Sequence, residues 1–257
     1  MKYIFPINSL ALFFLLLTFT ACEKKSDTGD LTINLVQNIA GKPLIINEWV
    51  YQSPAGHPYK LRRLQKIYSD FELINTEGVS IPFSMKHYFE LGRTETKNFV
   101  LKNIPAGTYN KIRFVFGLNE ARNKDNAYPD ELDMINFKWP TALGGGYHYM
   151  RFEVTADSMG SGKIKDFNLH TGATYGNQNY LNITLEMEDM VVDGNNHSMD
   201  LIMDLNEWLQ NPYVYNFETF GFGIMGNQDA QEVLKANGVT VFSVKGPFPE
   251  NEFNHLK

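Results

Sequence analysis

Apolar and polar side chains alternate along most of the chain from Leu31 onward. Leu31, Ile33 and Leu35 alternate with Thr32 and Asn34, which is the period of a strand with one buried face. Similar segments, separated by turn-forming residues, recur at 66–74, 84–91, 98–101, 112–118, 147–154, 164–170, 181–187 and 199–205. Many short strands with such turns predict an all-β protein, a β-sandwich or barrel, and we expect a single β-sandwich domain of antiparallel strands.

Helical patterns are scarce. A short helix is predicted at 230–237, where Asp229 can cap the first turn, Glu232 occupies the reciprocal position of a capping box, and Gly238 suits a left-handed final residue. A one-turn helix is predicted at 206–210. Neither an internal repeat nor a linker divides residues 31–257, which favours one domain.

A long segment, 119–146, interrupts the strand pattern. Its length inside a compact domain suggests a functional or a disordered loop. Met134, Phe137 and Trp139 favour an ordered loop, because large apolar side chains gain free energy on burial. Three consecutive glycines, 144–146, allow backbone conformations that other residues avoid.

The N-terminal segment reads as a bacterial lipoprotein signal. Lys2 precedes an apolar run at 10–17, which is short for a bilayer-spanning helix, and a small residue stands directly before Cys22. We therefore predict a signal peptide at 1–21 and a lipidated tether at 22–30. The acylated Cys22 would attach the protein to a bacterial membrane, at the periplasmic face or the cell surface. An ordinary signal peptide and an uncleaved anchor are the alternatives.

Composition excludes several classes of function. Cys22 is the only cysteine, so its acylation leaves no thiol for disulfides or thiolate zinc sites. A net charge of −6 argues against nucleic acid as a partner. Hydrolase elbows, zinc-protease helices and phosphate-binding loops are all missing from the sequence. We predict a protein that is not an enzyme, although a glycosidase carboxylate pair could be present among the scattered acidic residues.

Four of the six histidines give no signal of a site. His57, His197 and His255 stand in polar, turn-like or terminal segments, where solvated side chains are expected. His87 lies in a predicted strand beside Tyr88, without another metal-ligating residue nearby. These four residues are therefore not expected to bind a ligand.

His148 and His170 differ from the others. His148 alternates with Met150 and Phe152 in its predicted strand, so we expect it to face the core. A buried histidine must satisfy each ring nitrogen, or it costs on the order of 1–3 kcal/mol. His170 ends the next predicted strand, and pairing of the two strands would bring the rings within reach of one metal ion. Two hydrogen-bonded structural histidines are the alternative.

The residue types near these histidines indicate which metal would fit. No thiolate and no carboxylate clusters with them in the sequence, which disfavours thiolate zinc, calcium and magnesium. Imidazole with nearby thioether or aromatic groups suits copper, particularly the cuprous ion. Met134 and Met150 are the nearest thioethers, and core packing is the alternative role for each.

The same region resembles a known family. Segment 139–150, WPTALGGGYHYM, followed by segment 167–172, FNLHTG, is similar to the signature of MbnP-like proteins. These are methanobactin-associated periplasmic copper-binding proteins and related lipoproteins. Segments 105–109, 203–208 and 223–227 also agree in order and spacing, and the resemblance spans roughly 31–244.

The resemblance implies an exported β-sandwich protein that binds copper. In the better-understood relatives, histidines hold the ion together with a tryptophan that a partner di-haem enzyme oxidises to kynurenine. By position, His148 and His170 would be the ligands, and Trp139 would be the candidate for oxidation. Family members often have two tryptophans one residue apart, whereas this chain has Phe137 and Trp139. If Phe137 occupies the modified position, no kynurenine can form.

Two functions follow as hypotheses. In the first, the protein sequesters or delivers copper through His148 and His170, the 119–146 loop covers the ion, and binding weakens as the pH falls through the histidine range. In the second, a metal-free surface or adhesion module contacts glycan or protein through exposed aromatic side chains, namely Tyr51, Tyr59, Tyr175 and Tyr180.

Overall fold

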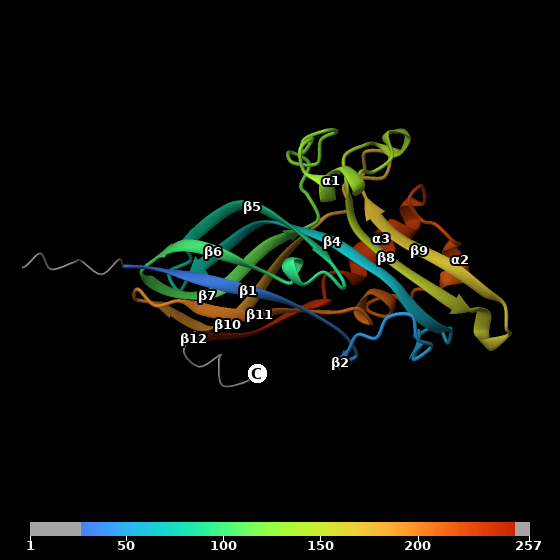
Figure 1. The fold of residues 1–257 in the computed structure, drawn as a ribbon, viewed down its shortest axis with the longest axis horizontal. Coiled ribbons are helices and arrows are strands. Elements are labelled where there is room, and N and C mark those ends of the chain that lie inside the picture. Colours follow the sequence, from blue (N-terminus) through green and yellow to red (C-terminus); the bar gives the residue numbers. More distant parts are fainter. Residues whose placement is uncertain (1–26, 250–257) are drawn as a thin grey trace, which may run out of the picture.

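The computed structural model of the protein describes residues 27–249. Two sheets pack face to face (Figure 1), and buried aliphatic and aromatic side chains fill the space between them. The predicted all-β sandwich is therefore confirmed. The predicted signal segment 1–21, Cys22 and His255 lie outside the described residues.

The first sheet is built around a parallel pair of strands. Its strands are β1 (Thr28–Ile39), β2 (Lys42–Pro43), β6 (Asn98–Pro105), β11 (His197–Asp204) and β12 (Phe242–Pro249). β1 pairs with β11 in parallel and with β6 and β2 in antiparallel fashion, while β12 pairs with the other edge of β11. The predicted alternation in β1 is confirmed, because Leu31, Ile33 and Leu35 are all buried.

The second sheet is organised around one long strand, which pairs with several of the others. Its strands are β3 (Tyr51–Gln52), β4 (Pro58–Asn75), β5 (Ser80–Glu90), β7 (Gly107–Phe116), β8 (His148–Asp157), β9 (Ile164–Gly172) and β10 (Leu181–Val192). The first half of β4 pairs with β8, and its second half pairs with β5 and β7. β8 and β9 therefore extend beyond the sandwich, toward the right in Figure 1.

Helices are short and lie at the ends of the sheets. They are α1 (Leu132–Asn136), α2 (Phe217–Phe220) and α3 (Gln228–Asn237), with 3-10 turns η1 (Thr94–Thr96), η2 (Thr141–Leu143), η3 (Ser158–Gly160) and η4 (Glu207–Leu209). None of the helices described is long and apolar enough to cross a membrane. The predicted turn at 206–210 is present as η4. α1 and η2 lie inside the 119–146 loop, which is ordered as predicted.

The ends of α3 differ from the prediction. The side chain of Asn227, rather than Asp229, caps the helix by accepting a hydrogen bond from the backbone N–H of Ala230 at 3.1 Å. Gly238 has a right-handed φ of −61°, so the predicted left-handed ending is wrong. A Cβ at this position would lie 2.3 Å from the Leu181 side chain. Close packing therefore explains the glycine, and sequence spacing could not reveal it.

A lysine side chain is buried in the sandwich core. Lys66 of β4 is 0% exposed, and its Nζ donates to the Sδ of Met203 at 2.6 Å. The same Nζ lies 4.7 Å from the ring centroid of Phe89. Burial lowers the pKa of Lys66 well below its ordinary value, because an unpaired charge is poorly solvated in such surroundings.

Candidate metal site

The two histidines of interest lie next to each other on adjacent strands. β8 and β9 are antiparallel neighbours in which His148 pairs with Gly172 and Arg151 pairs with His170. The ring centroids of His148 and His170 are 5.1 Å apart, and the ring planes are inclined by 80°. Strand pairing therefore brings two imidazoles to one place.

The face of β8 that carries His148 differs from the prediction. The register between β8 and β9 shifts between His148 and Met150, so the simple alternation of these two residues is broken. Met150 packs in the main core, whereas His148 lies on the side of Arg151 and His170. The predicted common face of His148 and Met150 is wrong, because one irregular position reverses the side on which a residue points.

The 119–146 loop encloses His148 with two aromatic rings. The ring centroid of Trp139 lies 4.9 Å from that of His148 in an edge-on contact, and that of Phe137 lies 5.2 Å away. Backbone hydrogen bonds attach the loop to the start of β8, from Trp139 N to Gly146 O and from His148 N to Phe137 O, both at 2.9 Å. The three glycines at 144–146 all have positive φ, as their sequence predicted. All three rings are buried.

One ring nitrogen of His148 is satisfied and the other is not. Its Nδ1 lies 3.0 Å from the carbonyl oxygen of Phe137, and because a carbonyl only accepts, we assign the proton to Nδ1. Nε2 is then a bare lone pair, and it is buried without a hydrogen-bond partner among the described residues. A buried unsatisfied nitrogen of this kind requires an explanation.

His148 is held in its neutral form. Burial, followed by the positive charge of Arg151 and the proximity of His170, lowers the pKa of His148 to about 2. The Nη2 of Arg151 lies 3.3 Å from the Nδ1 of His148 and donates to the carbonyl of Asn136 at 2.9 Å. Because His148 is neutral throughout the ordinary pH range, loss of metal in mild acid would not originate at this residue.

His170 contacts a buried carboxylate that the sequence did not reveal. Its Nε2 lies 3.0 Å from the Oε1 of Glu153, which also accepts from the Nη1 of Arg63 at 3.0 Å. Burial of Glu153 opposes ionisation, but the hydrogen bond from His170 and the charges of Arg63 and Arg62 hold its pKa below the ordinary value. The expectation that no carboxylate clusters with the histidines is therefore wrong. Strand alternation places Glu153 on the same face as Arg151. Only the register between β8 and β9 shows that His170 lies opposite Arg151 on this face.

A family model and a solved structure match this chain. The MbnP family model matches residues 28–225, more than half of the chain. The chain belongs to the MbnP family. The solved structure of MbnP from Methylosinus trichosporium aligns with a TM-score of 0.54 at 12% identity, covering 84% of this chain and 98% of that one. This likeness shows a shared fold, and no curated protein matches the chain.

The two predicted thioethers of this MbnP-family chain do not join the histidines in one cluster. Met150 belongs to the main core, and Met134 packs in a smaller apolar cluster with Phe137 and Tyr147. Across residues 27–249, no group of three or more histidine, cysteine, aspartate or glutamate side chains is arranged to hold a metal ion. Any metal at this place would therefore depend on the two imidazoles.

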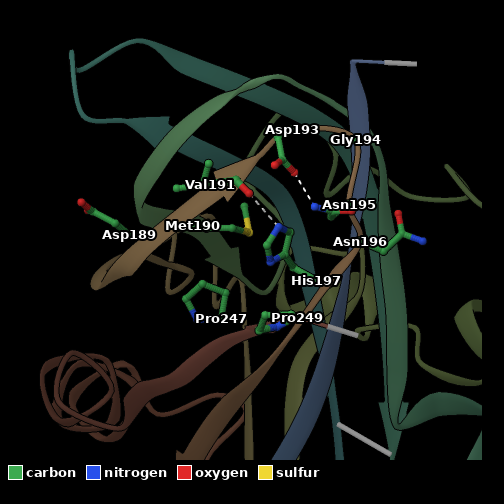
Figure 2. A pocket seen from close by; sticks show the side chains of 10 residues that line it. All are labelled: Asp189, Met190, Val191, Asp193, Gly194, Asn195, Asn196, His197, Pro247 and Pro249. Atoms are coloured by element: carbon green, nitrogen blue, oxygen red, sulfur yellow. Dashed lines mark hydrogen bonds between the residues drawn. The ribbon is translucent and has the colours of Figure 1, made fainter. Parts of the chain in front are cut away.

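Two other histidines are buried, although their sequence contexts predicted solvated side chains. His57 is buried, and its Nε2 lies 3.2 Å from the Oδ1 of Asn216. His197, at the start of β11, lines a surface pocket between Val191 and the prolines of β12 (Figure 2). It is 7% exposed, its Nε2 contacts the Val191 carbonyl at 2.9 Å, and its Nδ1 is buried without a described partner.

The aromatic residues of the adhesion hypothesis are mostly covered. Tyr59 is 0% exposed and lies in the core, so its predicted surface role is wrong. Tyr51 and Tyr180 are only partly exposed, and the hydroxyl of Tyr51 accepts from the backbone N–H of Ile45. Tyr175 alone among the four is well exposed, at 62%. The four side chains therefore do not form the exposed aromatic set that this hypothesis requires.

Gly172→Ala tests the packing between the loop and the histidine strands. A Cβ at Gly172 would lie 2.5 Å from Cε3 of Trp139, so the indole must move away from its place beside His148. We expect a loss of about 1–3 kcal/mol in the free energy of unfolding, measured by denaturant titration. Gly223→Ala is the matched control, because no described atom lies within 4 Å of a Cβ there. Equal stability of the two variants would contradict the predicted packing.

Proposed function

We propose that this MbnP-family protein binds a copper ion between His148 and His170 and acts by sequestration or delivery rather than catalysis. The observation that carries the proposal is the buried, unsatisfied Nε2 of His148, whose ring adjoins a second imidazole at 5.1 Å. A metal ion would give this lone pair a partner, which would offset the cost of burying it. The ordered 119–146 loop would cover the ion with Trp139 and Phe137.

The small number of donor groups favours copper over other ions. Structural zinc sites use four ligands, and calcium requires six to eight oxygens. Two neutral imidazoles suit the cuprous ion, which accepts few ligands and binds imidazole well. The resemblance of the segments around His148 and His170 to copper-binding MbnP-like proteins supports the same choice.

We also propose Trp139 as the residue that a di-haem partner enzyme would oxidise. Both members of the family's tryptophan pair correspond to positions beside His148, and Trp139 is the one that carries an indole in this chain. Peptide mass mapping of protein from the native host would show kynurenine at Trp139. An unmodified Trp139 in copper-loaded native protein would contradict this part of the proposal.

The proposed cellular setting is the bacterial envelope, with acylated Cys22 as the membrane attachment. The N-terminal sequence pattern supports this proposal. Intact mass of the membrane-extracted protein would show the acyl chains on Cys22. A soluble product whose first residue is not Cys22 would contradict it.

Copper retention by the purified protein tests the central proposal. The protein is incubated with cuprous ion under anaerobic, reducing conditions and separated from free metal by gel filtration. We expect stoichiometric copper in the protein fraction, and no stoichiometric zinc or calcium after parallel incubations. Protein that elutes without copper would overturn the proposal.

A further inference from the structure

We infer that Glu153 is a positioning residue that fixes the tautomer of His170 and thereby presents its Nδ1 lone pair to the metal ion. The inference rests on the proposed copper function for its role, but the tautomer itself is a property of the metal-free protein. It can therefore be tested separately from copper binding.

The geometry of the Glu153–His170 contact defines where the proton lies. The Oε1 of Glu153 is 3.0 Å from the Nε2 of His170, within normal hydrogen-bond distance. An ionised carboxylate can only accept, so Nε2 of a neutral His170 must carry the proton. Nδ1 is then the nitrogen with the free lone pair.

The surroundings of Glu153 hold its carboxylate in place. Arg63 of β4 donates to its Oε1 at 3.0 Å, and the Nη1 of Arg62 lies 3.5 Å from its Oε2. Arg62 is itself fixed by Asn168 of β9, whose Oδ1 accepts from its Nη2 at 2.9 Å. Three adjacent strands thus contribute to one network of hydrogen bonds and ion pairs that ends on the imidazole of His170.

The two histidines are held through different ring nitrogens. The carbonyl of Phe137 engages Nδ1 of His148, whereas the carboxylate of Glu153 engages Nε2 of His170. Each ring therefore keeps a different nitrogen free, Nε2 on His148 and Nδ1 on His170. Metal-binding histidines generally donate their second N–H to a carboxylate or a backbone carbonyl, which sets both orientation and basicity. Here His148 uses a backbone carbonyl and His170 uses a carboxylate.

The backbone of His170 is also anchored. The side chain of Gln231, on α3, donates from Nε2 to the carbonyl of His170 at 2.8 Å, and its Oε1 accepts from Gly172 N at 3.3 Å. Gln231 is fully buried. With its backbone held by α3 and its ring held by Glu153, His170 retains little freedom to turn away from His148.

Nitrogen-15 NMR of the histidine rings in metal-free protein at neutral pH tests the tautomer. In the wild type, the neutral form of His170 is expected to carry its proton on Nε2. Glu153→Gln is expected to give an averaged or Nδ1-protonated ring, because the amide offers an N–H where the carboxylate only accepts. Asp166→Asn is the matched control, since Asp166 joins the same network through Arg62 without contacting His170. It should leave the His170 signals unchanged.

The copper affinity of the same variants tests the positioning role. Glu153→Gln is expected to weaken copper binding by roughly 10–100-fold, with Asp166→Asn close to wild type. A neutral wild-type ring that is protonated on Nδ1, or a Glu153→Gln ring identical to wild type, would overturn the inference. So would equal copper affinity in wild type and Glu153→Gln. Failure of wild-type protein to bind copper would instead overturn the proposed function, and the NMR result would remain decisive for the tautomer.

Discussion

Replacing His148 with alanine is expected to reduce copper in the purified protein from a stoichiometric level to background. His148 supplies one of the two imidazoles at the proposed site, and its Nε2 is buried without a hydrogen-bond partner among the described residues. A single remaining imidazole holds an ion weakly in competition with small chelators. The measurement is metal analysis after gel filtration, on His148→Ala, His170→Ala and the double variant.

A control variant at another buried histidine distinguishes the loss of a metal ligand from the loss of a buried ring. His197 is also buried and also has one unsatisfied nitrogen, but it lies in the pocket of Figure 2, and its hydrogen bond goes to the carbonyl of Val191. His197→Ala should therefore retain copper. Because truncating a buried ring can cost several kcal/mol, circular dichroism must show that each variant is folded, and His148→Gln offers a variant of closer volume. Folded His148 variants that keep full copper would contradict the proposal.

The fold could be predicted because one face of each main strand is buried. Leu31, Ile33 and Leu35 illustrate this: alternate positions must be apolar for β1 to lie over the core, and that requirement is visible in the sequence. β12 was not predicted, because its sequence does not show such an alternation. Its segment, FSVKGPFP, contains glycine and two prolines and lies at the edge of its sheet, where alternation is weakly constrained.

The site could be predicted only in part. The positions of His148 and His170 on successive strands indicated that their rings could meet, because neighbouring antiparallel strands place such residues side by side. The register shift before Met150 could not be predicted, since a single irregular residue leaves little trace in composition. Without that register, Glu153 could not be placed beside His170 either.

Buried polar side chains were the main source of error. His57 and His197 stand in polar, turn-rich segments, and local composition therefore predicted solvated rings. In the structure each is covered by elements distant in sequence, His57 near Asn216 and His197 beside β12. Burial of a single residue depends on the whole packing arrangement, whereas a pattern of many residues reports only the average environment of a segment.

Lys66 is another buried polar residue that the local sequence did not reveal, and we expect its burial to have a larger effect on the free energy of unfolding. Its neighbours in β4 predicted a strand, but nothing local indicated that this lysine faces the core. The contacts of its Nζ are a thioether and aromatic rings. An ammonium group there has no carboxylate partner among the described residues. Burial therefore lowers the pKa of Lys66 well below its ordinary value in the folded protein, whereas the side chain of the unfolded chain is charged at neutral pH.

Lys66→Met is therefore expected to stabilise the protein at neutral pH, on the order of 1–4 kcal/mol. Below the ordinary lysine pKa, the unfolded chain binds a proton that the native protein does not, so wild-type stability falls as the pH falls from that value toward the lowered pKa of folded Lys66. The slope from this group is about 1.4 kcal/mol per pH unit in that window. The Met side chain fills a similar volume and removes the slope.

Urea unfolding of the metal-free protein between pH 7 and pH 10 provides the measurement. The variant should be more stable than wild type at pH 7, and the difference should shrink as the pH rises, because alkaline pH removes the proton from unfolded Lys66 as well. Lys102→Met, at an exposed position of β6, controls for the general loss of one positive charge and should follow the wild-type curve. A Lys66→Met curve parallel to wild type would mean that the ammonium group stays charged in the core.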